Sequence, residues 1–231
     1  NSLKKKDGAV TGGGRLFLQN ENFSEEIISP KKGRVHMKVK HISIAVYPEQ
    51  TGNPVFGAPA DLTAYILEPV EGITDKKRPA VLLCPGGGYH KLSGREDQPI
   101  AMKYLAAGFH VFVLHYSLVP DVFPRALMEL ALSMKLIREH GNEWNVDVKR
   151  IAVSGFSAGG HLACCLGTFW NKEWLYKALE VKPEIIQPNG MILCYPVITS
   201  EEYCHKGSFE CLMGTEASKK DVELRRLLSL E

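Results

Sequence analysis

The segment Gly155-Phe156-Ser157-Ala158-Gly159 decides the fold of this 231-residue chain. It follows an apolar run at residues 151–154 and leads into an amphipathic pattern at residues 158–170. The serine is therefore expected at a sharp turn between a buried strand and a helix. The two glycines leave room where a side chain would strike the neighbouring backbone. A serine that only capped the helix would not explain both glycines, so the segment predicts a serine hydroxyl aimed by its turn.

The same alternation of apolar runs and amphipathic segments continues on both sides of this turn. It is typical of a parallel sheet covered by helices. Two earlier segments, 35–47 and 62–67, have period two and predict an antiparallel strand pair. The expected fold class is α/β, with a mostly parallel twisted sheet and helices on both faces. The expected later strands are residues 80–84, 111–116, 151–154 and 191–194, and the expected helices are 100–107, 123–140, 158–170 and 217–231.

Composition restricts the function classes. The 28 Lys and Arg residues nearly balance the 26 Asp and Glu residues, so no basic field predicts a nucleic-acid or membrane partner. The spacing of Cys and His matches no zinc site, and neither a metal nor a cofactor is expected.

Length and patterning predict one α/β domain over residues 35–231, preceded by a polar, flexible arm at residues 1–34. No apolar run reaches 18 residues, and the first residues lack a secretory pattern, which favours a cytoplasmic protein. Because the sequence does not begin with Met, removal of an upstream signal and export stay open.

A second motif, Pro85-Gly86-Gly87-Gly88-Tyr89, follows the expected strand at 80–84. Successive glycines let backbone N–H groups converge on a small anion, although a plain glycine-rich turn is the simpler alternative. A serine nucleophile needs such donors for the oxyanion it creates. Gly87, Gly88 and Ala158 are the expected donors. The order of the two motifs is that of the oxyanion loop and nucleophile turn of esterases.

Together these segments resemble the esterase/lipase group of α/β-hydrolases, and most of all the small carbohydrate esterases related to acetyl-xylan and feruloyl esterases. The resemblance extends from about residue 35 to the C-terminus. It implies a serine carboxylic-ester hydrolase that forms an acyl-enzyme on Ser157. The implied small-molecule substrates are acetyl or other short-acyl esters, carbohydrate esters among them. Further segments that carry the resemblance are residues 61–65, 93–96, 116–118 and 147–153.

The resemblance also implies roles for residues around the serine. Tyr89 and Tyr116 are expected to line the pocket, and His161, on the nucleophile helix, is expected to be structural. Asp147 and Arg150 are expected to tie the loop before the nucleophile strand. The pair Arg95 and Glu96 is open to two interpretations, a pocket contact or an ion pair that supports the glycine loop, which is the segment 85–89.

The acid and the base of the expected triad are not evident. In this fold they follow the serine in the order acid, then histidine. After Ser157 the histidines are His161 and His205, and Asp221 comes after both. We therefore expect a fragment or a C-terminally truncated product of a longer hydrolase, lacking the last strand or strands. Pairing with a second copy, as a homo-oligomer, is one way to cover the sheet edge that this leaves exposed. His205 is a candidate pocket residue and a candidate for the base.

Two other functions compete with the esterase. The absent acid and base are also typical of a non-catalytic hydrolase-like scaffold. A serine peptidase of the prolyl-oligopeptidase type uses a similar serine turn, but the glycine loop fits esterases better and no propeller-like domain precedes the core.

Overall fold

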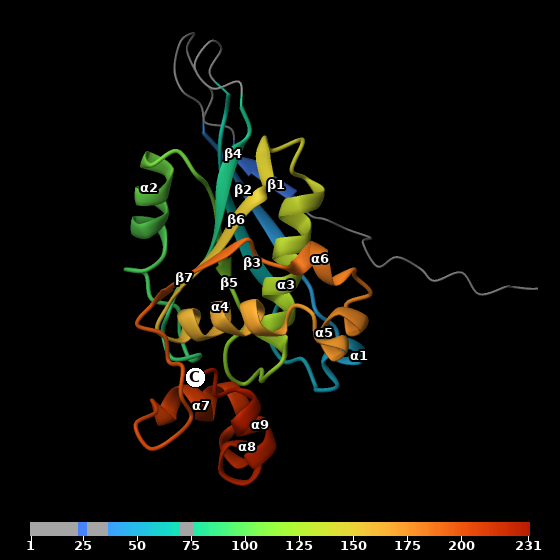
Figure 1. Cartoon of the computed structure of the whole chain (residues 1–231), viewed down its shortest axis with the longest axis vertical. Coiled ribbons are helices and arrows are strands. Elements are labelled where there is room, and N and C mark those ends of the chain that lie inside the picture. Colours follow the sequence, from blue (N-terminus) through green and yellow to red (C-terminus); the bar gives the residue numbers. More distant parts are fainter. Residues whose placement is uncertain (1–22, 27–36, 70–75) are drawn as a thin grey trace, which may run out of the picture.

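The computed structural model describes residues 23–26, 37–69 and 76–231. In these ranges seven strands form one sheet in the order β1-β2-β3-β5-β4-β6-β7 (Figure 1). Neighbours from β1 to β5 pair antiparallel, whereas β5, β4, β6 and β7 pair parallel. Only β1 and β3 therefore run against the other strands, which confirms the mostly parallel sheet. The strands are β1 Phe23–Glu26, β2 Met37–Ile44, β3 Ala60–Leu67, β4 Arg78–Cys84, β5 His110–His115, β6 Val146–Phe156 and β7 Gly190–Cys194.

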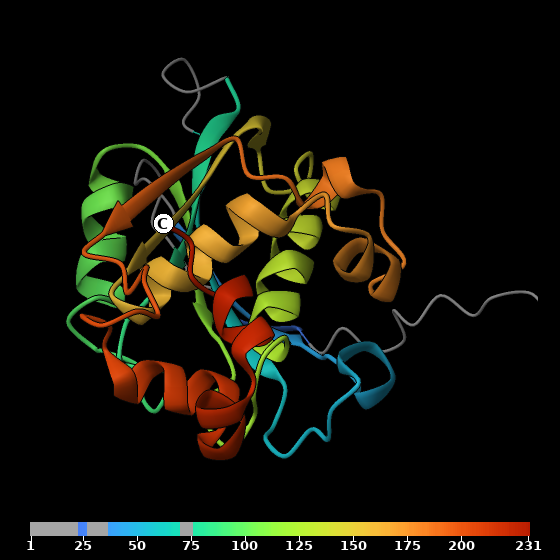
Figure 2. The same cartoon turned by 60° about the horizontal axis from the view of Figure 1, so that its bottom comes forward.

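Helices cover both faces of the sheet, as predicted. Helix α2 lies on one face and helices α3 and α4 lie on the other (Figure 1). Helices α7 to α9 lie beyond one end of the sheet, which Figure 2 brings forward. None of the helices in the described ranges is both long and apolar enough to cross a membrane. The helices are α1 Pro48–Thr51, α2 Gln98–Ala106, α3 Arg125–Glu139, α4 Ala158–Phe169, α5 Glu173–Ala178, α6 Pro183–Ile186, α7 Lys206–Met213, α8 Thr215–Lys220 and α9 Val222–Leu227.

Strand alternation explains how the sheet packs against both layers. Along β5, Val111 and Val113 belong to the apolar cluster under α2, and Phe112 and Leu114 belong to the larger cluster under α3 and α4. All four side chains are completely buried. Burial of such a side chain contributes about 1.5–3 kcal/mol, so both faces of the central strands stabilise the fold.

Two sequence-based expectations are corrected. The segment 217–231 is not one helix, because Oδ1 of Asp221 accepts a hydrogen bond from the Leu224 amide (2.8 Å) and caps a new helix, α9. Part of the expected flexible arm is also structured, since Phe23–Glu26 pairs with β2 as strand β1. The rest of that arm, residues 1–22 and 27–34, lies outside the described ranges.

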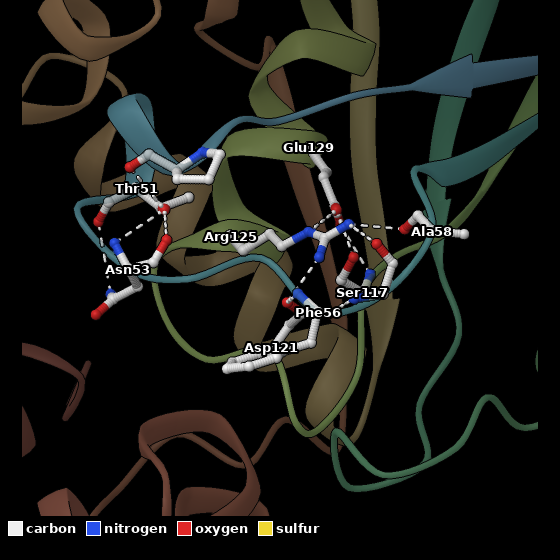
Figure 3. Close-up of polar contacts among 10 residues, drawn as sticks. Thr51, Asn53, Phe56, Ala58, Ser117, Asp121, Arg125 and Glu129 are labelled. Atoms are coloured by element: carbon white, nitrogen blue, oxygen red, sulfur yellow. Dashed lines mark hydrogen bonds and ion pairs between the residues drawn. The ribbon is translucent and has the colours of Figure 1, made fainter.

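A buried ion network connects α3 to two loops (Figure 3). The Arg125 guanidinium contacts Asp121 through Nη1 (2.6 Å) and Glu129 through Nε (3.0 Å), and it donates to the carbonyl of Ala58 (2.7 Å). All three charged side chains are almost fully buried. Paired charges are tolerated in such a place only when their remaining polar atoms are also satisfied.

The carboxylates of the network meet that condition through backbone donors. Glu129 accepts from the Ser117 amide (2.7 Å), and Asp121 accepts from the amides of Phe56 (2.8 Å) and Gly57 (3.0 Å). Burial raises the pKa of Glu129, against the effect of Ser117 and Arg125. The network thereby fixes the loop that follows β5.

The substitution Arg125→Met tests this network. It would leave two buried carboxylates without their cation, and we expect a loss of about 3–5 kcal/mol in the free energy of unfolding, measured by urea denaturation. Arg150→Met is the matched control, because the Arg150 ion pair is largely exposed and should matter little. Equal effects of the two variants would contradict the network's role.

Candidate active site

Ser157 lies between β6 and α4 with a strained backbone. Its φ of 51° and ψ of −117° fall in the left-handed half of conformational space, which costs a residue other than glycine roughly 1–3 kcal/mol. Three backbone hydrogen bonds hold it there. The Ser157 amide donates to Cys194 (3.0 Å), and its carbonyl accepts from the amides of His161 (3.0 Å) and Val197 (3.1 Å). The expected strand-turn-helix setting of Ser157 is confirmed.

The flanking glycines are required by backbone contacts. A Cβ atom on Gly155 would lie 2.1 Å from the carbonyl oxygen of Gly159. A Cβ atom on Gly159 would lie 2.1 Å from the carbonyl oxygen of Cys84, at the end of β4. No side chain fits at either position unless the backbone moves.

The glycine loop passes directly beside the serine. A Cβ atom on Gly86 would lie 3.0 Å from the Ser157 Cβ atom, and Gly87 and Gly88 have φ values of 131° and 69°. The Gly86 amide donates to Oε2 of Glu96 (2.9 Å). In the described part of the chain, the Gly87 and Gly88 amides have no hydrogen-bond acceptor. The amide of Ala158 opens α4, where helix geometry provides no acceptor. Their role as oxyanion donors stays a prediction.

Tyr89 and Tyr116 support the glycine loop from inside the protein. Their side chains are 3% and 2% exposed, and the rings meet edge to face with centroids 5.8 Å apart. The Tyr116 hydroxyl donates to the Pro85 carbonyl (2.7 Å), and the Tyr89 hydroxyl donates to Nδ1 of His161 (2.8 Å). Both hydroxyls are thus used internally, and contact of either ring with a substrate stays a prediction.

His161 has the structural role expected for it. It is 1% exposed, and Nε2 donates to the Leu228 carbonyl (2.9 Å) while Nδ1 accepts from Tyr89. Burial lowers its pKa to about 4. A neutral imidazole with both nitrogens engaged is not available to take a proton from Ser157.

His205 lies at the N-cap of α7, on the exposed surface. Its Nδ1 atom is 2.8 Å from the hydroxyl of the buried Ser208, whose amide also donates to it (3.3 Å). Ser208 in turn lies beside the glycine loop, since a Cβ atom on Gly88 would be 3.5 Å from its Oγ atom. Ser208 was not expected near the site from the sequence, although its spacing of three residues from His205 is typical of a helix cap. A contact of His205 with substrate stays a prediction.

The two charged pairs have different outcomes. Nε of Arg150 lies 2.6 Å from Oδ2 of Asp147, as expected. Of the two interpretations of Arg95 and Glu96, the ion pair is not seen among the described residues, where Arg95 is exposed. Glu96 accepts hydrogen bonds from neutral donors instead, and it supports the glycine loop by itself.

A cluster at the carboxyl end of β5 was not foreseen. His115 faces Asp61 on β3, with Nδ1 3.4 Å from Oδ2, and its Nε2 is 2.7 Å from Oδ2 of Asp97. Asp61 also contacts His41 (3.4 Å) and accepts from the Thr63 hydroxyl (2.9 Å). The hydrogen bonds to Asp61 and Asp97 raise the pKa of His115 to about 9, and the bond to His115 lowers the pKa of Asp61 to about 2. Among the described residues, no group of three metal-binding side chains has the arrangement of a metal site.

Comparison with known proteins gives consistent relatives. The family model described as BD-FAE matches residues 69–191, more than half of the chain. Endo-1,4-beta-xylanase B of Butyrivibrio fibrisolvens is 33% identical over 158 residues, which are 65% of this chain and 24% of that protein. Acetylxylan esterase of Xylanibacter ruminicola is 30% identical over 142 residues, 61% of this chain and 27% of that protein.

Solved structures share the same fold. The acetyl ester-xyloside bifunctional hydrolase from Caldicellulosiruptor lactoaceticus superposes with a TM-score of 0.61 and 31% identity, covering 75% of this chain and 63% of that one. The carboxylesterase Cest-2923 from Lactobacillus plantarum superposes with a TM-score of 0.60 and 28% identity, covering 85% of this chain and 66% of that one. The chain spans roughly a quarter of the length of the two curated relatives. The α/β-hydrolase fold expected from the sequence is confirmed.

The strain at Ser157 predicts an unusual response to substitution. Glycine adopts a positive φ freely, whereas alanine keeps the Cβ atom and the strain. We expect Ser157→Gly to be about 1 kcal/mol more stable to urea than Ser157→Ala. A less stable glycine variant would show that the turn is not strained.

The His115 cluster predicts a pH dependence of stability. The folded pKa of about 9 lies above the ordinary value of 6.5, so protonated His115 stabilises the fold. This contribution is complete below pH 6.5 and is lost as the pH rises through 9. Between pH 6 and pH 10, the free energy of unfolding measured by urea denaturation should fall more for the wild type than for His115→Gln. Parallel curves would contradict the assignment.

Proposed function

The chain belongs to the BD-FAE family, and from this membership we propose that it acts as a serine carboxylic-ester hydrolase on acetyl or other short-acyl esters. The observation that carries the proposal is the position of the glycine loop, which passes so close to the strained Ser157 that a Cβ atom on Gly86 would lie 3.0 Å from the Ser157 Cβ atom. Relatives described as an acetylxylan esterase and as an acetyl ester-xyloside hydrolase support acetylated carbohydrate as the substrate class.

The proposed reaction has two steps. Oγ of Ser157 attacks the ester carbonyl carbon, and the carbonyl oxygen becomes an oxyanion held by the amides of Gly87, Gly88 and Ala158. Collapse of this intermediate breaks the bond to the alcohol, which leaves with a proton. Water then attacks the acyl-enzyme, releases the carboxylic acid and restores the Ser157 hydroxyl. Loss of one oxyanion donor typically lowers kcat by about 10²–10³-fold.

The base that takes the Ser157 proton is a separate question. We infer that it is not His161, because both of its ring nitrogens are engaged in the core. The Nδ1 lone pair of His205 is occupied by Ser208, so His205 would have to change its hydrogen bonds to serve as base. Without a base, a serine site keeps only about 10³–10⁴-fold catalysis over water.

The proposal is tested with p-nitrophenyl acetate and with a fluorophosphonate probe. We expect the wild type to hydrolyse the ester and to carry one probe molecule on Ser157, detected by mass spectrometry. Ser157→Ala should lose both activities, because the attacking oxygen is gone.

Ser154→Ala is the matched control, since Ser154 is buried in β6 and pairs with Tyr104 (3.2 Å). It should keep probe labelling and hydrolysis. Equal rates for the wild type and Ser157→Ala would contradict an esterase and favour a non-catalytic scaffold.

A further inference from the structure

The Glu96 carboxylate bridges two segments of the site that are distant in sequence. Its Oε2 atom accepts from the Gly86 amide (2.9 Å), and its Oε1 atom accepts from the Tyr195 hydroxyl (2.6 Å). An ionised carboxylate has two acceptor oxygens, so it can hold both donors at once. Hydrogen bonds to a charged acceptor are also stronger than neutral ones.

On one side of the bridge, the glycine loop is closed onto Glu96. The Ser93 amide donates to the Gly86 carbonyl (2.8 Å), and the Glu96 amide donates to the Ser93 carbonyl (3.0 Å). A Cβ atom on Gly86 would lie 2.6 Å from the Glu96 carboxylate and 2.6 Å from the Phe156 carbonyl. Gly86 is therefore confined between Glu96 and the backbone that precedes Ser157. Its orientation also determines where the Gly87 N–H group points.

On the other side, Tyr195 belongs to the backbone that holds the serine. It follows Cys194, whose carbonyl accepts from the Ser157 amide (3.0 Å). Tyr195 has a φ of 38°, which is strained for a tyrosine, yet its side chain is 64% exposed. Its ring meets Phe156 edge to face with centroids 5.8 Å apart. The Tyr195 hydroxyl donates a hydrogen bond to Glu96, and that bond raises the pKa of Tyr195 to about 12.

We propose that Glu96 is a positioning residue, which sets the distance and orientation of the glycine loop relative to the Ser157 turn by binding Gly86 and Tyr195 together. Its effect on catalysis rests on the proposed esterase function. Glu96 does not touch the reacting atoms in this role. Misplacement of a catalytic group by about 1 Å is enough to cost roughly 10²-fold in rate.

The first test measures, without any substrate, how firmly Glu96 holds the Gly86 amide. Amide hydrogen exchange of the peptide that contains Gly86 is followed by mass spectrometry in the wild type, Glu96→Ala, Glu96→Gln and Arg95→Ala. We expect at least about tenfold faster exchange at Gly86 in Glu96→Ala, because a backbone donor loses its acceptor. Glu96→Gln keeps one acceptor oxygen for Gly86 and an amide that can donate to the Tyr195 hydroxyl, so it should remain near the wild type. Arg95→Ala is the neighbouring control and should change nothing.

The second test measures kcat and KM on p-nitrophenyl acetate. Glu96→Ala should lower kcat by about 10–100-fold with little change in KM, since the loop donors act in the transition state. Glu96→Gln should recover most of the rate. Tyr195→Phe should lower kcat by a smaller factor while the Gly86 amide stays protected.

Each result bears on the proposal. Unchanged exchange at Gly86 in Glu96→Ala overturns it, and so does faster exchange with an unchanged kcat. If Glu96→Ala does not fold, an unchanged kcat in Tyr195→Phe overturns the bridge. A wild type without hydrolysis or probe labelling would refute the esterase function, whereas the exchange at Gly86 would still decide whether Glu96 holds the loop.

Discussion

The contact between the backbones at Gly159 and Cys84 is the constraint on which the rest of the site depends. Strands β4 and β6 are parallel neighbours with Cys84 opposite Gly155, so the chain leaves both strands at the same edge of the sheet. The first turn of α4 then packs on the end of β4 with no side chain between them. Any larger residue at Gly159 would separate the two strand ends. The glycine loop and Ser157 are adjacent because of this contact.

The local strain at Ser157 is offset by bonds formed elsewhere. Ser157 is held in its left-handed conformation by the carbonyl of Cys194, the last residue of β7, and by the amide of Val197, which follows that strand. Such conformations persist only where the surroundings determine them, and they are concentrated at functional sites. Here the surroundings are the sheet, whose central strands are buried on both faces. The free energy of the core therefore maintains a turn that would not be stable in isolation.

The sequence was sufficient for features that local patterns encode, and insufficient for those that tertiary contacts create. Apolar runs and paired glycines predicted the central strands, the Ser157 turn and the adjoining loop. The cluster around His115 depends on the register of β3 with β5, which no local pattern reveals. The bonds of Arg125 to Ala58 and of Glu96 to Tyr195 likewise join residues that are distant in sequence. The break at Asp221 could have been foreseen, because aspartate is a common N-cap, but the apolar spacing favoured a continuous helix.

The polar groups around the serine turn share one property: most of them are satisfied within the protein. The hydroxyls of Tyr89 and Tyr116 and both nitrogens of His161 bind inside the core, and Gly86 binds Glu96. In the same region, the amides of Gly87 and Gly88 belong to a loop whose residues Pro85 and Gly86 are bound by Tyr116 and Glu96. Donors that are fixed before charge develops need no reorganisation during a reaction, which is why preorganised dipoles stabilise transition states more than mobile ones do. The internal hydrogen bonds thus restrain the loop, and in the proposed reaction the developing anion would be met by the amides of Gly87 and Gly88, which have no acceptor among the described residues.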